Sequence, residues 1–339
     1  MGLNSAKIRH PIPVYIQSRA RVLAVLSLLG LLLPLASPLI PYTPGAWTET
    51  LIWLIDLGAH WQWFYLASLL LFGALAALGD RRWAIILLAV PLPWHTASPS
   101  APQANGMGVP LIVMSTNLHL DNADARPLLG LVAQYQPDVL VLLELSPEYA
   151  KQLNNLDAYP HRQFNADNSP FGMGVLSRHP LRDVRVVHDE DDIPTITAEL
   201  DVDGKPLRVI TFHPMPPLEP RFHTARNEAL KSMARDAQHH DAPTVIVGDF
   251  NATPWSSALT GLDALGFRRA SSLEGTWPAA LGVMGLPLDQ VLVSKTGAVE
   301  SFRVIDGLGS DHRATLTQLH FTSPPAPKTA PIVSSSARN

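Results

Sequence analysis

The stretch from Val245 to Trp255, VIVGDFNATPW, combines residue types that suit phosphate chemistry. Its apolar start, Thr244 to Val247, is typical of a buried strand, and a glycine then precedes Asp249 and Asn251. In an extended segment residues i and i+2 point the same way, so one carboxylate and one carboxamide are expected to face a common site. A carboxylate can orient or deprotonate water, and an amide NH2 can donate to a phosphoryl oxygen. Taken alone, the stretch is equally compatible with an Asx-rich turn after a buried strand.

Polar residues stand at the ends of several other apolar runs, where open α/β folds place their sites. They are Asn117 after LIVMST, Glu144 after VLVLL, His213 after VITF, Asp289 before QVLV, and Asp311 with His312 before ATLTQL. Each one alone is more simply explained as a turn, capping or surface residue. Together they offer hard oxygen ligands for Mg2+ or Mn2+ in Glu144, Asn117 and Asp311, and a histidine with carboxylates that can orient it.

Short apolar runs alternate with helical patterns between Leu111 and Leu319, and these elements must position the polar residues. Strands are predicted at 111–115, 139–143, 172–176, 184–187, 195–201, 205–212, 244–247, 290–293 and 314–319, and helices at 125–135, 147–156 and 221–238. Many short strands with helices between them favour a two-sheet α/β sandwich. A doubly wound parallel sheet is the competing architecture.

Composition separates an apolar N-terminal third from a polar remainder. The chain has 339 residues, of which 47% are hydrophobic and 16% charged, and the apolar excess lies in the first hundred. The absence of cysteine excludes disulfides, zinc-thiolate sites and cysteine nucleophiles. From Leu111 to His320, 26 acidic residues face 17 Lys and Arg, an excess of nine. A domain that follows a nucleic-acid backbone normally carries a basic face, so this balance gives no support to such a role.

Three apolar runs predict a membrane region: Val22 to Ile40, about Trp61 to Leu78, and a shorter run from Trp83 to Trp94. Tryptophans near their ends match interfacial aromatic belts. A cleavable signal peptide is the alternative for the first run, disfavoured because two more runs follow. The positive-inside rule puts the basic N-terminus and the Arg81–Arg82 loop in the cytoplasm, so three spans place the remaining chain on the opposite side. If the third run does not cross, that part is cytoplasmic instead.

These patterns divide the chain into four parts. Residues 1–98 are predicted to be a membrane region with about three transmembrane helices, and residues 99–110 a flexible linker rich in Ser, Ala, Pro and Gly. Residues 111–321 are predicted to form the catalytic domain, and residues 322–339 a disordered tail.

Seven motifs resemble one known family in its own order. They are MSTNLH, LLELSPE, GMGVLSRHP, TFHPMPP, GDFNATPW, LDQVLV and GSDHRAT, and they cover residues 111 to about 319. The chain resembles the endonuclease/exonuclease/phosphatase superfamily, which includes DNase I-like nucleases, neutral sphingomyelinases and inositol-polyphosphate 5-phosphatases, and in particular its bacterial members with hydrophobic N-termini. The resemblance implies a two-layer β-sandwich flanked by helices, the DNase I-like four-layer α/β sandwich, preceded by an N-terminal helical transmembrane region.

The resemblance also implies roles for individual residues. Metal binding falls to Glu144, with Asn117 as a ligand or phosphate contact and Asp311 completing the shell. Activation of the attacking water falls to Asp249. Binding of the phosphoryl oxygens falls to Asn251 and His213, and His312, held by Asp289, acts as a base or a phosphate ligand.

One departure from the family's pattern qualifies this resemblance, and three helix residues raise a separate question. Some nucleases of the family carry an acidic residue two positions after the first motif's Asn, where this chain has His119, which puts a second metal contact in doubt. Arg221, His223 and Arg226, in the predicted helix after HPMPP, could face a phosphate, although a solvated helix face is the favoured interpretation.

The sequence therefore predicts a membrane-anchored phosphoesterase that depends on Mg2+ or Mn2+. Its substrate would be a phosphodiester or phosphomonoester in nucleic acid, phospholipid or a small molecule, and no motif points to a protein partner. The expected location is the bacterial inner membrane, multi-pass, with the catalytic domain on the periplasmic side. A non-catalytic, membrane-tethered binding or scaffold protein on the same fold is the alternative, and the joint presence of the polar residues argues against it.

Overall fold

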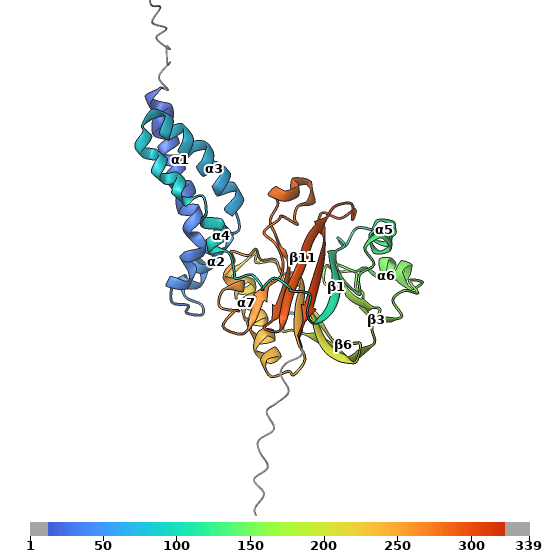
Figure 1. The fold of residues 1–339 in the computed structure, drawn as a ribbon. Coiled ribbons are helices and arrows are strands. Elements are labelled where there is room, and N and C mark those ends of the chain that lie inside the picture. The colour runs from blue at the N-terminus through green and yellow to red at the C-terminus, as the bar shows by residue number, and fades with distance from the viewer. Residues whose placement is uncertain (1–12, 323–339) are drawn as a thin grey trace, which may run out of the picture.

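The computed structural model describes residues 13–322. A bundle of N-terminal helices, coloured blue to teal, stands beside a β-sandwich that contains the rest of the chain (Figure 1). The basic residues Lys7 and Arg9 and the tail from Ser323 to Asn339, predicted to be disordered, lie outside the described residues.

Six strands form the first sheet, in the order β11-β12-β1-β2-β4-β3. Strands β1 and β2 are parallel, and the other neighbours are antiparallel. The strands are Val109–Asn117 (β1), Val139–Leu143 (β2), His161–Asn165 (β3), Met173–Ser177 (β4), Gly297–Ile305 (β11) and Ala314–Phe321 (β12).

Six further strands form the second sheet, in the order β5-β6-β7-β8-β10-β9. Here β7 and β8 are the parallel pair. The strands are Leu181–His188 (β5), Pro194–Val202 (β6), Lys205–Thr211 (β7), Thr244–Asp249 (β8), Phe267–Arg269 (β9) and Asp289–Ser294 (β10).

Alternating side chains build the layers of the sandwich. In β8, Val245 and Val247 point into the core between the sheets, whereas Ile246 points outward into a second cluster with Leu230 of helix α7 (Pro220–Gln238). Helices α5 (Arg126–Tyr135) and α6 (Pro147–Leu153) cover the outer face of the first sheet through their own apolar cluster. This arrangement confirms the predicted four-layer α/β sandwich and excludes the doubly wound parallel sheet.

Three strands were not predicted from the sequence: β3, β9 and β11. Strand β3 contains a single large apolar residue, Phe164, and β9 has only three residues. Strand β11 lies at the edge of its sheet and carries Glu300 and Arg303, so it lacks the continuous apolar run of a buried strand.

Two antiparallel helices form the body of the N-terminal bundle: α1 (Val14–Leu32) and α3 (Gln62–Gly79). They approach closely at glycines, since Gly30 lies against Tyr65 and Gly79 against Gln17. Within residues 13–322, the stretches Val14–Leu35 and Gln62–Gly79 are long and apolar enough to cross a membrane. Short 3-10 turns η1 (Leu33–Leu35) and η2 (Ser37–Leu39) follow α1.

The third predicted span is not an α-helix of spanning length. It consists of a 3-10 helix, η3 (Arg81–Ala89), and a short helix, α4 (Leu92–Thr96), separated near Pro91. Proline lacks a backbone N–H and cannot sit in the interior of a helix without breaking its hydrogen bonds, which accounts for the interruption. The segment packs back along α3, with Ile86 and Leu87 against Gly73.

Helix α2 (Trp47–Ala59) lies at the end of the bundle nearest the sandwich (Figure 1). Its Asp56 is buried and pairs with Arg226 of α7 at 2.8 Å. The neighbouring His60 lies 2.9 Å from Thr253 Oγ1. Asp56 and His60, which lie just before the second predicted span, therefore bind the domain.

The segment predicted to be a flexible linker is hydrogen-bonded to the sandwich. Ala101 N donates to Arg269 O at 2.7 Å, and Ala104 N donates to Val299 O at 2.8 Å. Ser100 and Gln103 form isolated parallel bridges with the same two residues. Backbone pairing therefore fixes this stretch, although its composition is typical of a linker.

Candidate active site

Strand ends from both sheets bring the predicted polar residues to one edge of the sandwich. Asn117 is the last residue of β1 and pairs in register with Leu143, which directly precedes Glu144. In the second sheet Asp249 ends β8 and lies opposite Asp289, which begins β10. The parallel pairs β1/β2 and β7/β8 end at this edge, and β10 begins there because it runs antiparallel to β8.

Asp249 is the centre of the cluster. Its Oδ2 accepts a hydrogen bond from Asn117 Nδ2 at 3.2 Å and lies 3.7 Å from His213 Nε2 and 3.5 Å from His312 Nε2. All four side chains are buried. One carboxylate thus connects residues from both sheets and from two loops.

His312 and Asp289 form a buried pair, with Nδ1 2.9 Å from Oδ2. Burial opposes protonation of His312, but the charges of Asp289 and Asp249 outweigh it and raise its pKa to about 10. Burial also raises the pKa of Asp289, and the imidazolium counteracts part of that rise. At neutral pH His312 is therefore a cation, which can donate a hydrogen bond but cannot accept a proton.

The backbone around Asp249 is adapted to close approach. A Cβ at Gly248, whose φ is 151°, would overlap the carbonyl oxygen of Phe212. Because His213 follows Phe212, this glycine allows β8 to reach the loop that carries the histidine. Asn251 adopts a left-handed φ of 48°, and its backbone N–H donates to Asp249 Oδ1 at 2.9 Å. Its side-chain Nδ2 donates to Pro214 O at 3.1 Å, which leaves one amide hydrogen for a ligand.

Glu144 and Asn117 offer the oxygen-rich position in the cluster. Asn117 Nδ2 donates to Glu144 Oε1 at 2.9 Å, and the backbone N–H of Leu120 donates to Oε2 at 2.9 Å. The residues described contain no group of three or more His, Cys, Asp or Glu side chains arranged to hold a metal ion. Mg2+ nevertheless commonly uses only one or two carboxylates and completes its shell with water and substrate phosphate, so Glu144 suits it.

Asp311, the third predicted metal ligand, contacts other residues. Its Oδ2 accepts a hydrogen bond from Trp277 Nε1 at 2.8 Å, and its Oδ1 lies 3.4 Å from His119 Nδ1. The side chain is exposed at the rim of the cluster. The structure therefore places Asp311 beside the site, where its carboxylate contacts Trp277 and His119 while Glu144 and Asn117 bind each other.

Two residues at the site were not predicted from the sequence. Thr276 Oγ1 accepts a hydrogen bond from the backbone N–H of Asp289 at 3.1 Å and so fixes the start of β10. Trp277 holds Asp311 and lies with its ring centroid 6.4 Å from that of His312. Both belong to a loop without a recognisable motif, so no local signal marks them.

The helix residues expected to be solvated are mostly buried, so that interpretation was wrong for two of the three. Arg226 pairs with Asp56 of α2, and it donates from Nη1 to the carbonyl of Asn251 at 2.6 Å. His223 is buried beside the same aspartate, with 3.3 Å between Nε2 and Oδ2. Only Arg221 is exposed, where it pairs with Asp191.

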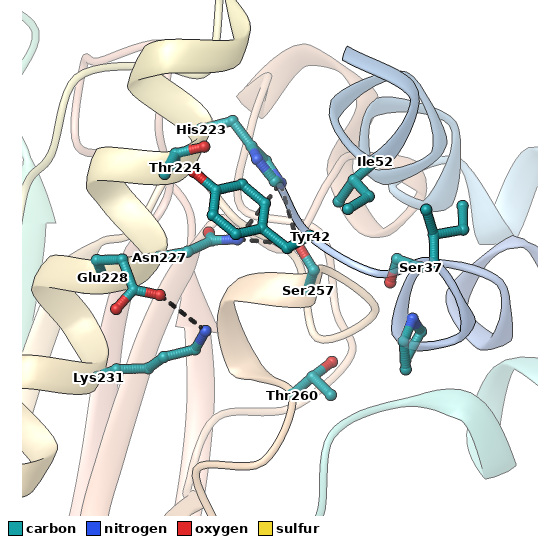
Figure 2. Close-up of a pocket in the computed structure, with 12 residues that line it drawn as sticks. Ser37, Tyr42, Ile52, His223, Thr224, Asn227, Glu228, Lys231, Ser257 and Thr260 are labelled. Carbon is teal, nitrogen blue, oxygen red and sulfur yellow. Dashed lines mark hydrogen bonds and ion pairs between the residues drawn. The ribbon is translucent and has the colours of Figure 1, made fainter. Parts of the chain in front are cut away.

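A pocket lies at this junction between the N-terminal region and the domain (Figure 2). Tyr42 and Ile52 line it from one side, and His223, Asn227 and Ser257 line it from the other. The three polar side chains of the domain hydrogen-bond one another, at 3.0 Å from Ser257 Oγ to both His223 Nε2 and Asn227 Nδ2. None of the predicted strand-end residues lines this pocket, so we assign the chemistry to the strand ends.

Comparison with known proteins identifies the sandwich. A model of the Endonuclease/Exonuclease/phosphatase family matches residues 114–312, which is more than half of the chain. No curated protein matches the chain.

Solved structures share the fold at low sequence identity. D. rerio TDP2 in complex with a single-strand DNA product superimposes with a TM-score of 0.54 and 18% identity, over 62% of this chain and 99% of that chain. An endonuclease/exonuclease/phosphatase from Beutenbergia cavernae gives 0.53 and 20%, over 64% and 73%. The 3' phosphatase NExo from Neisseria, bound to a product DNA hairpin, gives 0.51 and 21%, over 62% and 99%. At such identities the similarity shows the fold alone.

Proposed function

The chain belongs to the endonuclease/exonuclease/phosphatase family, and from this membership we propose that it is a metal-dependent phosphoesterase anchored in a membrane. The observation that supports this best is the convergence on Asp249 of Asn117, His213 and the His312–Asp289 pair. A carboxylate flanked by a fixed cation and an amide donor suits attack on a phosphate ester.

In the proposed reaction the residues divide into an acceptor and several donors. Asp249 orients the attacking water and accepts its proton, because His312 is already protonated at neutral pH. The His312 imidazolium donates a hydrogen bond to a phosphoryl oxygen, and the free amide hydrogen of Asn251 donates to another. His213, whose Nε2 also lies near Asp249, binds a phosphoryl oxygen, and its buried Nδ1 has no hydrogen-bond partner in the residues described.

A divalent cation fits this donor set. Glu144, with Asn117 beside it, would hold Mg2+ or Mn2+, and Asp311 would complete the surrounding hydrogen bonds from the rim. When bound, the cation would neutralise charge on the phosphate as it is attacked.

The substrate is a phosphodiester or phosphomonoester. TDP2 and NExo, which share the fold, are seen with DNA products, which keeps nucleic acid among the candidates. The excess of acidic over basic residues in the sandwich favours a phospholipid or a small molecule instead.

We further propose that the chain crosses a bacterial inner membrane three times and carries its catalytic domain on the periplasmic side. Helix α1 and helix α3 supply two passes, and the η3–α4 segment returns beside α3 to the end where the domain lies. Arg81 and Arg82 then share the distal, cytoplasmic end of the bundle with Arg19 and Arg21. Proteinase K added to intact spheroplasts should digest the domain while a cytoplasmic marker survives; protection of the domain would contradict this orientation.

Hydrolysis by the full chain in detergent tests the proposed activity. The panel is bis-p-nitrophenyl phosphate, plasmid DNA, RNA and phospholipid micelles, each with Mg2+, Mn2+ or EDTA. We expect metal-dependent turnover that falls at least about 100-fold in Asp249→Ala. The matched control is Asp263→Ala, which removes an exposed carboxylate away from the site and should keep full activity. Equal turnover by the two variants, or none by folded wild-type protein, would contradict the proposal.

A further inference from the structure

An uncharged loop rises from the rim of the active site. Between Glu274 and Asp289 the sequence TWPAALGVMGLPL contains no charged residue. Trp277 and Leu286 pair as the stem, and the 3-10 segment η5 (Ala279–Met284) forms the tip. The relative exposure of the three large apolar side chains at the tip is 47% for Leu281, 61% for Val283 and 41% for Met284. Such a cluster of exposed apolar side chains marks a surface that contacts something other than water.

One side of the loop is joined to the N-terminal bundle. Trp63, near the start of α3, donates from Nε1 to the carbonyl of Leu273 at 3.0 Å, just before the stem. The indole of Trp63 also packs edge-on against Trp94 and Trp255, with 5.3 Å between ring centroids in both pairs. The orange loop stands on the same side of the sandwich as the bundle (Figure 1). The tip therefore lies on the side where the apolar helices leave the domain.

The other side of the loop is joined to the active site. Ala279 N donates to Asp311 O at 2.6 Å, and Trp277 Nε1 donates to the Asp311 carboxylate. Thr276 Oγ1 accepts from the backbone of Asp289, the partner of His312. The loop is thus connected to His312 through two hydrogen bonds, one between Thr276 and Asp289 and one between Asp289 and His312.

We propose that this loop inserts its apolar tip into the lipid headgroup region beside the bundle, so that the active site faces the bilayer and accepts a phosphate ester carried by a lipid. The inference rests on the proposed membrane anchoring and phosphoesterase activity. The bilayer is the occupant that fits because the same chain places apolar helices next to the loop, and because Trp63 and Trp94, at the domain end of those helices, are of the residue type that favours a membrane–water interface. An uncharged tip also suits lipid better than a nucleic acid, which requires basic contacts.

Site-specific fluorescence tests the insertion without reference to activity. Since the chain has no cysteine, Met284→Cys in the full chain can be labelled with an environment-sensitive nitrobenzoxadiazole probe. The matched control is Met107→Cys, a methionine that is 64% exposed just before β1, at the opposite end of that strand from Asn117.

Reconstitution in vesicles of phosphatidylethanolamine and phosphatidylglycerol should shift the emission of the probe at 284 to the blue. Doxyl-labelled lipids should quench it about twofold or more, and the probe at 107 should respond to neither. Equal, water-like emission at both positions would overturn the proposal. So would a blue shift at 284 without lipid quenching, because that pattern indicates a protein partner or a second copy of the chain.

A second measurement addresses the substrate. In the same vesicles, Leu281→Ser with Val283→Ser should lower the ratio of lipid-phosphate to bis-p-nitrophenyl phosphate hydrolysis about tenfold, because lipid must be reached through the docked loop. An unchanged ratio would overturn the lipid-facing site. If the wild-type protein hydrolysed neither substrate while the probe at 284 still reported contact with lipid, the phosphoesterase proposal would be contradicted. The insertion of the loop would still be supported.

Discussion

Replacing Asp56 by alanine should destabilise the junction between α2 and the sandwich more than the loss of any exposed charge would. Asp56 Oδ2 lies 2.8 Å from Arg226 Nη2 and 3.0 Å from Ser256 Oγ, and both charged side chains are buried. Burial raises the pKa of Asp56, but the hydrogen bond with His223 and the charge of Arg226 outweigh it and hold the pKa well below its ordinary value. The aspartate is therefore ionised throughout the neutral range.

The expected loss follows from what the substitution leaves behind. In Asp56→Ala the guanidinium of Arg226 stays buried without a counter-charge, and removing one partner of a buried pair typically costs about 3–5 kcal/mol. For domains of 150–250 residues each kcal/mol lowers Tm by about 2–4 °C, so a fall of roughly 10 °C is expected. The contribution exists only while Asp56 is ionised. Because the pKa of Asp56 is lowered on folding, the stabilisation is present above pH 3.8, the ordinary pKa of an aspartate. It is lost as the pH falls below that value.

The assay is thermal unfolding of the full chain in detergent, followed by tryptophan fluorescence at pH 7. Asp191→Ala is the control, because it removes an equally short pair with Arg221 that is substantially exposed and should cost no more than about 1 kcal/mol. Asp56→Leu combined with Arg226→Met should recover at least half of the loss, since an apolar pair leaves no buried charge. Equal Tm values for the Asp56 and Asp191 single variants would refute the reasoning.

Four further predictions concern the site and its surroundings. Burial lowers the pKa of His60 to about 4. Its contribution to the free energy of unfolding, about 3 kcal/mol, should therefore be present above pH 6.5 and disappear as the pH falls through 4. His60→Gln should flatten this part of a plot of Tm against pH. The pKa of His312 is raised to about 10, so its stabilisation should be present below pH 6.5 and lost as the pH rises through 10; a wild-type Tm no more pH-dependent there than that of His312→Asn would contradict the assignment. Gly248→Ala should lower the free energy of unfolding by about 2 kcal/mol or more and lower kcat at least about tenfold, because its Cβ would overlap the carbonyl oxygen of Phe212. Gly130 in α5 has open space around it, so Gly130→Ala should raise stability by up to about 1 kcal/mol in the same unfolding assay. Glu144→Gln should raise the Mg2+ concentration for half-maximal hydrolysis about tenfold or more, and an unchanged Mg2+ titration would exclude Glu144 as the metal-binding residue.

The parts of the site that could be predicted from sequence are those set by local pattern. Val139–Leu143 is a continuous apolar run because β2 is buried on both faces, and the polar Glu144 directly after it marks the edge of the sheet. The same holds for β8 and Asp249. Which strand ends meet, however, depends on the strand order of the two sheets, which no local pattern encodes. Only the resemblance to a family implied that these residues share one site.

The parts that could not be predicted depend on partners distant in the chain. Arg226 lies 170 residues from Asp56, in a helix whose polar composition is typical of a solvated face. Asp56 itself lies in a short apolar segment before the second predicted span, where no local pattern indicates an ionic partner. Thr276 accepts a hydrogen bond from the backbone of Asp289, but it belongs to a loop whose composition indicates no functional residue. Strand β11 is an edge strand that carries charged residues, so it lacks the apolar run from which a strand is predicted.

The Asp56–Arg226 pair has a consequence for how this protein can be divided. A fragment that began at β1 would lack α2 and α4, and with them the counter-ion of Arg226, the His60 partner of Thr253 and the Pro93 carbonyl that accepts from Trp255 Nε1. Helices α2 and α4 thus supply partners for buried groups of the sandwich, and the N-terminal third is more than a detachable tether. Recombination that transferred the sandwich alone to another chain would transfer an incomplete fold, so the two parts are expected to have been inherited together.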